Sequence, residues 1–294
     1  PVAADEFGFH PIVNVVSNIM LSETTQTPLT FCIDGKWGSG KTSILKMIES
    51  QLDMLHVPCL WINGWHVEEK NELVSEIQHE IRRTFELATD EDKNKLDEWR
   101  KSPTKPAFQE LIANLLKKSN PHTSDVSTYR LSRLVIFIDD IDRALPNQIV
   151  MILKNLKLIL ETTGCVFVLG MDMDIVAKLL GNDRSIKNKT LQNTEISMKF
   201  GYSYLEKIIQ ISIKVPSITR IAVENYLEKK GFAPQIREII HWSPDHEILN
   251  PRRLKWYVNW LNISLQLLIS LPKPVEITNL SALRALALWY DYQE

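Results

Sequence analysis

The most informative part of the sequence is the glycine-rich stretch Gly35-Lys36-Trp37-Gly38-Ser39-Gly40-Lys41-Thr42. It matches the pattern G-x4-G-K-[ST] and stands between the apolar run Leu29–Asp34 and the amphipathic segment Lys41–Met54. The flanking segments are a predicted strand and a predicted helix, which is the context that this motif requires. Glycines let successive backbone N–H groups point at one anion, and the start of a helix adds positive potential. The motif therefore predicts a phosphate-binding loop in an α/β protein.

The side chains of this loop predict how a nucleotide is held. Lys41 is expected to reach the β- and γ-phosphates of ATP, where it would also assist catalysis, and Thr42 to offer its hydroxyl to Mg²⁺. The nucleotide-binding residues that we predict in the loop are Gly35, Trp37, Gly38, Ser39, Gly40, Lys41, Thr42 and Ser43.

A second motif is the apolar run Leu134–Asp139 followed by Asp140, which resembles a Walker B strand. Asp139 is predicted to hold Mg²⁺ through a water molecule, and Asp140 to polarise the water that attacks the γ-phosphate. Two adjacent carboxylates are costly unless a cation lies nearby. The alternative is that these aspartates only cap the next helix. Asp142 is expected either to cap a helix near Asn147 or to pair with Arg143.

Strands alternate with helices along most of the chain, which predicts a parallel sheet covered on both faces, a three-layer α/β/α fold. The predicted strands are Leu29–Asp34, Cys59–Asn63, Leu134–Asp139, Cys165–Asp172 and Gln210–Val215. The predicted helices between them are Lys41–Met54, Asn71–Leu87 and Asn147–Glu161.

Asp172 ends the fourth predicted strand. A polar side chain at this position of a nucleotide-hydrolysing sheet can reach the γ-phosphate or the attacking water, so Asp172 is a candidate catalytic residue. The alternative is that it caps the following helix, a role that Asp174 fits better by position.

The chain divides into two predicted domains. Residues 1–216 form a P-loop NTPase core, with a polar insertion at 88–132 that is partly helical, and 181–199 are predicted to be a polar loop. Residues 217–294 are predicted to form a C-terminal helical domain. Its predicted helices are Arg220–Lys230, Pro234–His241, Pro251–Ser270 and Thr278–Tyr290.

The third of these helices begins with Asn250, Pro251, Arg252 and Arg253. Asn250 is a good N-cap and Pro251 a good first residue. Two arginines in the first turn oppose the helix dipole, which favours an anion nearby. Arg252 or Arg253 is therefore predicted to contact a nucleotide phosphate; the alternative is two solvated arginines.

Composition excludes several classes of protein. The 294 residues include 34 basic and 36 acidic ones, so binding of nucleic acid through bulk charge is not indicated. No apolar stretch is long enough to predict a membrane span. The three cysteines are predicted to be buried thiols in a cytoplasmic protein. Neither a zinc-ligand spacing nor a Ser–His–Asp arrangement is present. Trp61 and Trp65 are predicted core residues.

The sequence resembles the KAP family of P-loop NTPases. The stretches that carry the resemblance are residues 5–11, the tryptophan-containing loop 35–43, residues 61–65, the Ile-Asp-Asp-Ile-Asp-Arg run at 138–143, residues 204–210 and residues 250–253. The resemblance implies an ATPase core with a helical lid. It also implies that Asp140 is the catalytic carboxylate, that Arg252 or Arg253 is a sensor on the lid, and that Phe7 and Phe9 lie near the adenine.

Many members of the family carry transmembrane helices between the two Walker motifs, whereas this chain has the polar segment 88–132 there. Bacterial members often occur in phage-defence settings. Together the motifs predict a Mg²⁺-dependent ATP-binding and ATP-hydrolysing switch within a larger protein or complex, with a protein partner or a homo-oligomer. The alternatives are a P-loop kinase for a small molecule and a nucleotide-dependent interaction module that does not hydrolyse.

Overall fold

The computed structural model describes residues 5–66, 70–85, 90–118, 133–156, 159–182, 194–232, 237 and 249–269. The chain forms two compact units, each described here by itself. Unit 1 contains Pro11–Lys36 and Lys41–Val215, together with Pro1–Ala3. Unit 2 contains Ala4–His10, Trp37–Gly40 and Pro216–Glu294. The four residues at the tip of the phosphate-binding loop therefore group with the C-terminal unit.

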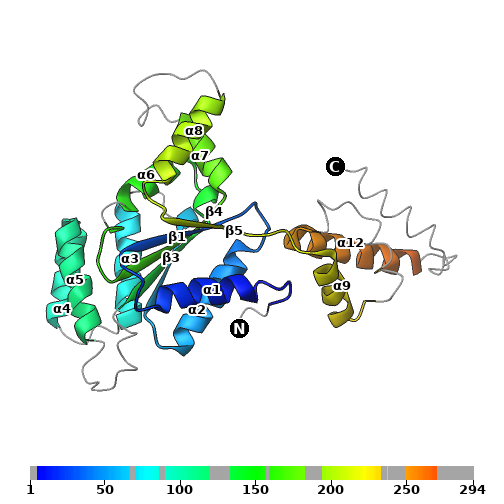
Figure 1. Ribbon diagram of the computed structural model, residues 1–294, viewed down its shortest axis with the longest axis horizontal. Coiled ribbons are helices and arrows are strands. Elements are labelled where there is room, and N and C mark those ends of the chain that lie inside the picture. The colour runs from blue at the N-terminus through cyan, green and yellow to red at the C-terminus, as the bar shows by residue number, and fades with distance from the viewer. Residues whose placement is uncertain are drawn as a thin grey trace. The chain divides into compact units, whose positions relative to one another are not determined.

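Unit 1 is built on a five-stranded parallel sheet, which confirms the predicted fold class. The strands are β1 (Leu29–Asp34), β2 (Cys59–Asn63), β3 (Leu134–Asp139), β4 (Cys165–Met171) and β5 (Ile211–Lys214). They lie in the order β2-β3-β4-β1-β5, and the neighbouring strands run parallel (Figure 1). The first three match the predicted bounds; β4 ends one residue earlier than predicted, and β5 is shorter at both ends.

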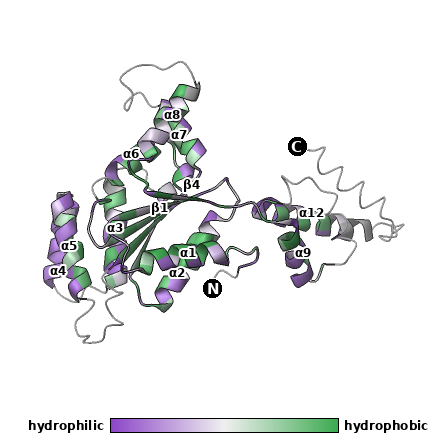
Figure 2. Ribbon diagram, in the orientation of Figure 1, coloured by the Kyte–Doolittle hydropathy of each residue, from purple (hydrophilic) through white to green (hydrophobic). Residues whose placement is uncertain are grey.

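Strand β4 lies between β1 and β3, so the Walker A and Walker B strands are not neighbours. Asp34 pairs with Met171, and Asn63 pairs with Asp139. The carboxyl ends of these strands therefore meet at one edge of the sheet, as the parallel arrangement requires. Strands β3 and β4 are buried along their whole length, and Figure 2 shows the hydrophobic strands of the sheet.

Helices cover both faces of the sheet. One face contributes Ile136 and Phe167 to a hydrophobic core that includes Leu73, Ile149 and Val176 from the covering helices. Those helices are α3 (Lys70–Phe85), α6 (Pro146–Leu156) and α7 (Met173–Asn182). Figure 1 shows α1 (His10–Leu21) and α2 (Lys41–Met54) together on the opposite face.

Helix α1 was not predicted. It begins inside residues 5–11, which the sequence analysis used only as evidence of the family resemblance. Its first turn is capped by Asp5, whose carboxylate accepts hydrogen bonds from the backbone N–H groups of Phe7, Gly8, Phe9 and His10. Burial alone would raise the pKa of Asp5, but these four bonds hold it below its usual value.

The described part of the predicted insertion consists of two helices, α4 (Asp90–Lys101) and α5 (Lys105–Lys118). Their contact includes the rings of Trp99 and Phe108, whose centroids are 4.9 Å apart. Both residues belong to the main core of unit 1. The segment is mostly hydrophilic in Figure 2, yet it contributes to the core.

The predicted polar loop at 181–199 was wrong in part, because helix α7 extends to Asn182 and α8 (Thr194–Leu205) occupies its end. These helices approach closely at two glycines. A Cβ atom on Gly181 would lie 2.1 Å from the Ser197 carbonyl oxygen, and one on Gly201 would lie 1.9 Å from that of Ala177. Glycine has a low helix propensity, but at these two positions the close packing of α7 and α8 leaves no room for a larger side chain. Residues 183–193 lie outside the described part.

Unit 2 contains helices α9 (Arg220–Lys229) and α12 (Pro251–Ile269), which agree with two of the predicted lid helices. Thr219 caps α9, since its hydroxyl accepts a hydrogen bond from the Ala222 N–H at 3.1 Å. The predicted helices Pro234–His241 and Thr278–Tyr290 lie outside the described residues, apart from Arg237.

Two further expectations meet the structure here. Trp61 is partly buried and stacks on Phe137, with ring centroids 5.3 Å apart, but Trp65 is 56% exposed, so the prediction that it lies in the core was wrong. Cys32 and Cys165 are buried free thiols, whereas Cys59 is only partly buried. No helix in the described part of the chain is long and apolar enough to cross a membrane.

Candidate functional site

Lys41 lies at the first position of α2 and is almost fully buried. Its Nζ donates a hydrogen bond to the Gly35 carbonyl oxygen at 2.7 Å. The same atom lies 3.4 Å from Oδ2 of Asp142. A buried ammonium group needs such partners, because burial of an unpaired charge is costly. The loop thus holds the lysine of the phosphate-binding motif against β1 and the segment after β3.

Asp139 ends β3 and is 3% exposed. Its carboxylate accepts a hydrogen bond from the backbone N–H of Asp140 at 2.8 Å. The Thr42 side chain is close enough to lower the pKa of this carboxylate. Burial raises the pKa of Asp139, and the nearby negative charge of Asp140 raises it further. The two predicted metal-binding residues, Thr42 and Asp139, are therefore near one another.

Gly170 of β4 provides the space for this carboxylate. A Cβ atom on Gly170 would lie 2.4 Å from Oδ1 of Asp139 and 2.8 Å from a methyl carbon of Leu45. Because β4 is the neighbour of β3, any larger side chain there would displace the Asp139 carboxylate. Sequence reasoning did not select Gly170, although a glycine inside a buried strand is a signal of close approach.

Asp140 adopts a left-handed backbone conformation, with φ 58° and ψ 31°, which turns the chain into the short 3₁₀ helix η3 (Ile141–Arg143). Its Oδ1 lies 2.9 Å from Nε of Arg143, and it makes no side-chain cap to η3. Arg143 therefore pairs with Asp140 and not with Asp142. Of the two roles predicted for Asp142, pairing with Arg143 was wrong, because Asp142 turns toward Lys41.

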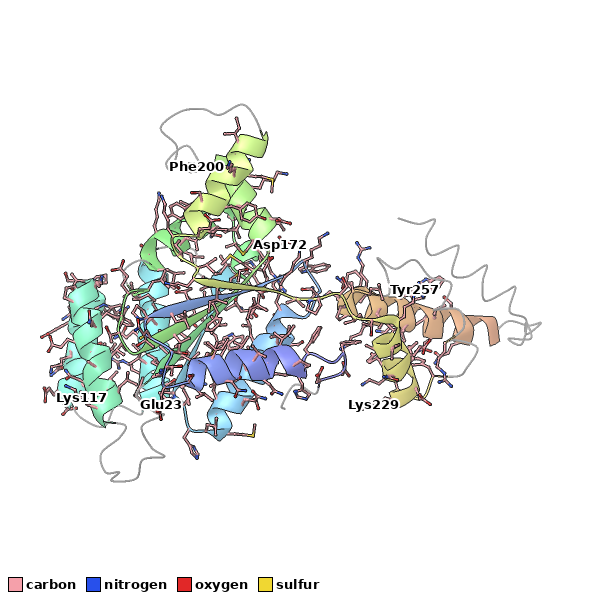
Figure 3. All side chains as sticks on the ribbon, in the orientation of Figure 1. Glu23, Lys117, Asp172, Phe200, Lys229 and Tyr257 are labelled. Atoms are coloured by element: carbon pink, nitrogen blue, oxygen red, sulfur yellow. The ribbon has the colours of Figure 1, made fainter. Side chains whose placement is uncertain are left out.

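Asp172, labelled in Figure 3, precedes helix α7 and caps it. Its Oδ1 accepts hydrogen bonds from the N–H groups of Asp174 at 3.1 Å and Ile175 at 3.3 Å. Asp174 bonds to the hydroxyl of Tyr202 instead, so the expectation that Asp174 fits the cap better was wrong. The catalytic role of Asp172 remains a prediction.

In unit 2 the start of α12 holds the tip of the phosphate-binding loop. The side-chain amide of Asn250 donates a hydrogen bond to the Trp37 carbonyl oxygen at 3.0 Å. Its Oδ1 accepts bonds from the N–H groups of Arg252 at 3.0 Å and Arg253 at 3.2 Å, as an N-cap does. The Arg252 N–H in turn points to the Gly38 carbonyl oxygen at 3.4 Å. Asn250 was predicted only as a helix cap.

The side chain of Arg252 lies on the indole of Trp37, with its guanidinium carbon 4.3 Å from the ring centre. Trp256 completes this group by an edge-on contact with Trp37 at 5.9 Å between ring centroids. Gly38 has φ +79°, and a Cβ there would lie 2.7 Å from Oδ1 of Asn250. This glycine is therefore required both by the backbone turn and by the approach of α12.

The N-terminal aromatic residues occupy two different places in unit 2. Phe9 is buried, and its ring lies 2.9 Å from where a Cβ atom on Gly40 would be. Phe7 contacts Tyr226 of α9, with ring centroids 5.1 Å apart. Phe9 thus borders the phosphate-binding loop, whereas Phe7 packs on α9. Their predicted position near adenine remains a prediction.

Glu6 anchors the same segment. It pairs with Lys230 at 3.0 Å and Lys255 at 2.6 Å. Burial alone would raise the pKa of Glu6, but the hydrogen bonds from Lys255 and Lys230 hold it below its usual value. Residues 5–10 are therefore tied to both described helices of the unit.

Two polar atoms of the motifs are buried without a hydrogen-bond partner among the described residues. They are Oγ of Ser39 and Oδ1 of Asp142. Buried polar groups are rarely left unpaired, so both atoms are places where a ligand or water would fit. Ser43, the last predicted residue of the loop, continues α2 after Thr42.

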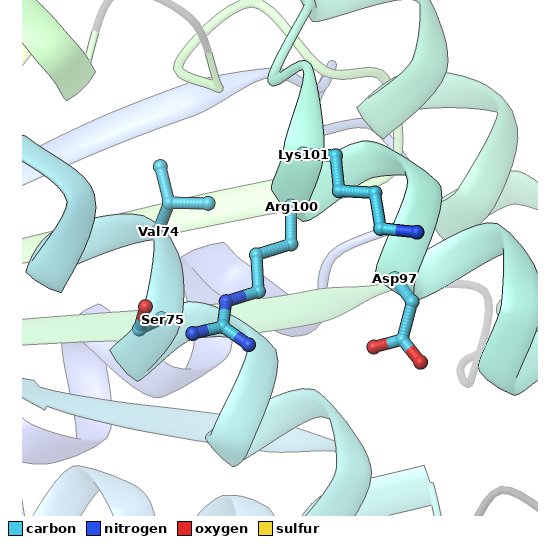
Figure 4. Close-up of a pocket in the computed structure, with 5 residues that line it drawn as sticks. All are labelled: Val74, Ser75, Asp97, Arg100 and Lys101. Carbon is cyan, nitrogen blue, oxygen red and sulfur yellow. The ribbon is translucent and has the colours of Figure 1, made fainter.

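Metal-binding clusters and cavities outside the nucleotide motifs are the other candidate sites. In the described ranges, no group of three or more His, Cys, Asp or Glu side chains is arranged to hold a metal. A cavity of about 500 Å³ is lined by Val74 and Ser75 of α3 and by Asp97, Arg100 and Lys101 of α4 (Figure 4). It contains no residue of the nucleotide motifs.

Comparison with known proteins agrees with the motifs. The family model described as the KAP family P-loop domain matches residues 9–268. The Phage T7 exclusion protein of Escherichia coli (strain K12) is 21% identical over 294 aligned residues, covering 83% of this chain and 37% of that protein. The chain thus spans little more than a third of the length of this relative.

Solved structures with a related arrangement include domain III of the replication initiation protein DnaA from Thermotoga maritima, at 13% identity and a TM-score of 0.45, covering 96% of this chain and 97% of that one. Another is the HORMA:CdnC:Trip13 complex of E. coli MS115-1, at 10% identity and a TM-score of 0.49, covering 95% of this chain and 88% of that one. Both scores lie below 0.5, so the assignment rests on the family match together with the loop and strand order. The chain belongs to the KAP family of P-loop NTPase domains.

Proposed function

We propose that this domain binds ATP with Mg²⁺, hydrolyses it, and works as a switch within a larger protein or complex. The observation that carries the proposal is the buried Lys41 of the phosphate-binding loop, whose Nζ donates to the Gly35 carbonyl oxygen at 2.7 Å, together with the buried Asp139 at the end of β3. The Thr42 side chain is near that carboxylate. A phosphate-binding lysine, a hydroxyl and a strand-end carboxylate form the set that P-loop ATPases use.

The donor set fits Mg²⁺ in particular. Mg²⁺ prefers hard oxygen ligands, and in nucleotide sites it takes one or two from the protein and the rest from water and phosphate. Thr42 would supply one of them directly, and Asp139 would hold the ion through a water molecule. The raised pKa of Asp139 supports the fit, because burial and the charge of Asp140 disfavour its ionised form and a bound cation would favour it. When bound, the ion would neutralise charge on the phosphate oxygens.

The chain's own residues would then divide the work. The loop N–H groups and Lys41 would hold the phosphates, and the Ser39 hydroxyl, which is buried and unpaired in the described structure, would bond to an oxygen of the nucleotide. Asp140 would accept a proton from the attacking water. Its bond to Arg143 orients the carboxylate. Asp172 caps α7 through Oδ1, so only its other carboxylate oxygen would be available near the γ-phosphate.

The helical unit 217–294 would be the lid, and 1–216 the core. Support comes from Asn250 and Arg252, which bind the carbonyl oxygens of Trp37 and Gly38. A change in the loop tip on nucleotide binding would therefore be felt at the start of α12. Such a coupling lets a ligand shift the population of two conformations. Arg253 is the arginine that we propose as a phosphate sensor.

A turnover assay tests this function. Purified chain is incubated with ATP, with Mg²⁺ or with EDTA, and free phosphate is measured with and without candidate small-molecule acceptors. We expect phosphate release that needs Mg²⁺ and no acceptor, and that is lost in Thr42→Ala and Asp139→Asn. Transfer to an acceptor would instead identify a kinase. ATP binding without phosphate release would identify a non-hydrolysing interaction module.

The relationship to the phage T7 exclusion protein supports a role in phage defence. Plaque counts test this role in cells that express the wild-type gene or its Lys41→Ala variant. Defence that depends on nucleotide predicts fewer plaques with the wild type only. Equal plaque counts in both strains and in empty cells would argue against it.

A further inference from the structure

Lys41, the lysine of the phosphate-binding loop, forms an ion pair with Asp142, which belongs to neither the loop nor the predicted metal-binding pair. Nζ of Lys41 lies 3.4 Å from Oδ2 of Asp142, and the two side chains are 7% and 5% exposed. A pair this deeply buried is screened little by solvent, so each charge strongly affects the energy of the other.

Asp142 has no competing cation in its own turn. Arg143, its chain neighbour, pairs with Asp140 at 2.9 Å. The second oxygen of Asp142, Oδ1, is buried and has no hydrogen-bond partner among the described residues. Lys41 is therefore the principal reason that this carboxylate is tolerated inside unit 1.

The same ammonium group is the one that would bind phosphate. A lysine Nζ has three donors. In the structure one faces the Gly35 carbonyl oxygen and one faces Asp142. A phosphate that approached Lys41 would meet the negative charge of Asp142 as a competitor.

We propose that Asp142 is the counter-ion of Lys41 in the nucleotide-free protein, and that nucleotide binds by taking Lys41 over from it. Asp142 is then a positioning residue that keeps Lys41 folded into the site and sets nucleotide affinity. This inference rests on the proposed nucleotide binding. It assigns Asp142 a role that differs from those of Asp139 and Asp140.

The exchange has two measurable consequences. Removing the charge of Asp142 leaves Lys41 without its counter-ion, which destabilises the nucleotide-free protein. It also removes the competitor for phosphate, so nucleotide should bind more tightly. The competing charge-assisted contact corresponds to an affinity gain of about 10-fold or more.

A double-mutant cycle tests the ion pair without any nucleotide. Thermal unfolding midpoints are measured for the wild type, Lys41→Met, Asp142→Asn and the double variant. Each single substitution strands one buried charge, so we expect the double variant to be more stable than Asp142→Asn alone. This comparison is sufficient even if Lys41→Met cannot be purified. A double variant that is no more stable than Asp142→Asn would overturn the pairing.

Calorimetric titration with ADP tests the exchange. Asp142→Asn should bind ADP about 10-fold or more tightly than the wild type. Glu80→Gln is the matched control, because it also removes the charge of a buried carboxylate, one that pairs with Arg83 on α3 at 2.6 Å and lies outside the nucleotide motifs. Its ADP affinity should stay within about 3-fold of wild type.

The outcomes separate this inference from the proposed function. Normal ADP binding by the wild type, with equal or weaker binding by Asp142→Asn, would overturn the exchange and leave the proposed function standing. Failure of every variant, including the wild type, to bind ADP and ATP would overturn the proposed function and the exchange with it.

Discussion

The guanidinium carbon of Arg252 lies 4.3 Å from the centre of the Trp37 ring. This contact joins the first turn of α12 to the exposed tip of the phosphate-binding loop. A cation over an indole at a partly exposed site is worth about 0.5–1 kcal/mol. The contact assigns Arg252 to the loop tip, so the two neighbouring arginines of α12 have separable roles.

The two arginines should therefore differ when each is replaced. We expect Arg253→Ala to reduce the preference for ATP over ADP by about 10- to 150-fold, the worth of one charge-assisted contact to phosphate. Arg252→Ala should weaken ATP and ADP binding alike, because it loosens the loop tip and does not touch the γ-phosphate. Titration with both nucleotides measures the ratio.

Trp37→Ala is the matched control for Arg252→Ala, since it removes the other half of the same contact. It should reproduce the effect of Arg252→Ala, and the double variant should add little. A selective loss of ATP affinity in Arg252→Ala, with none in Arg253→Ala, would reverse the assignment of the sensor. No change in either variant would mean that the pair is a solvated or partner-binding face.

Lys41→Ala should abolish nucleotide binding and turnover. It should also lower the unfolding temperature, because Asp142 would remain buried without its partner. Phosphate release and thermal unfolding measure the two effects separately. Lys41→Arg keeps the charge and should lose turnover with less loss of stability. Unchanged nucleotide affinity in Lys41→Ala would refute the assignment of the loop.

Asp139→Asn should stabilise the nucleotide-free, metal-free protein at neutral pH. The pKa of Asp139 is raised above 3.8, mainly by burial, so the folded state holds the proton more tightly than the unfolded state. The contribution of Asp139 to the free energy of unfolding is therefore largest below pH 3.8, and it decreases as pH rises through the folded pKa. The gain of the variant over the wild type should grow as pH rises above 3.8 and level off once pH exceeds the folded pKa of Asp139.

The metal dependence of stability provides the control for this experiment. Mg²⁺ with ADP should raise the unfolding temperature of the wild type and have much less effect on Asp139→Asn. An equal rise in the two proteins would remove Asp139 from the metal site.

Asp140→Asn should keep nucleotide binding and slow hydrolysis by about 10²-fold or more, if this carboxylate is the general base. Arg143→Ala should slow it less, because Arg143 only orients Asp140 through the 2.9 Å contact. Single-turnover phosphate release with both variants measures the order. Equal loss of nucleotide binding in Asp139→Asn and Asp140→Asn would show that the two roles are wrong.

The sequence was sufficient for the fold class and for the principal motifs. Continuous apolar runs such as Leu134–Asp139 are typical of parallel strands buried on both faces, and the spacing of Gly35, Gly40 and Lys41 predicted the loop and the helix after it. These features are local, because backbone conformation and burial pattern follow from neighbouring residues. The bounds of β1, β2 and β3 were predicted correctly for this reason.

Helices whose packing needs small residues were not predictable in the same way. Gly181 and Gly201 weaken the helical pattern of 181–201, but they allow α7 and α8 to approach closely. The gain comes from contacts between segments, which no local propensity contains. Trp65 was mispredicted for a related reason. An aromatic residue beside a buried strand was expected to lie in the core, but the tertiary structure leaves it exposed.

Partner choice among charged residues was decided only by the tertiary structure. In sequence, Asp140, Asp142 and Arg143 are neighbours, and several pairings are possible. The left-handed turn at Asp140 directs that carboxylate to Arg143 and leaves Asp142 facing Lys41, a residue 101 positions away. The sequence thus determined which residue types the site contains, because motifs are local patterns. The structure decided which charges meet, because buried ion pairs depend on the direction of each side chain in space.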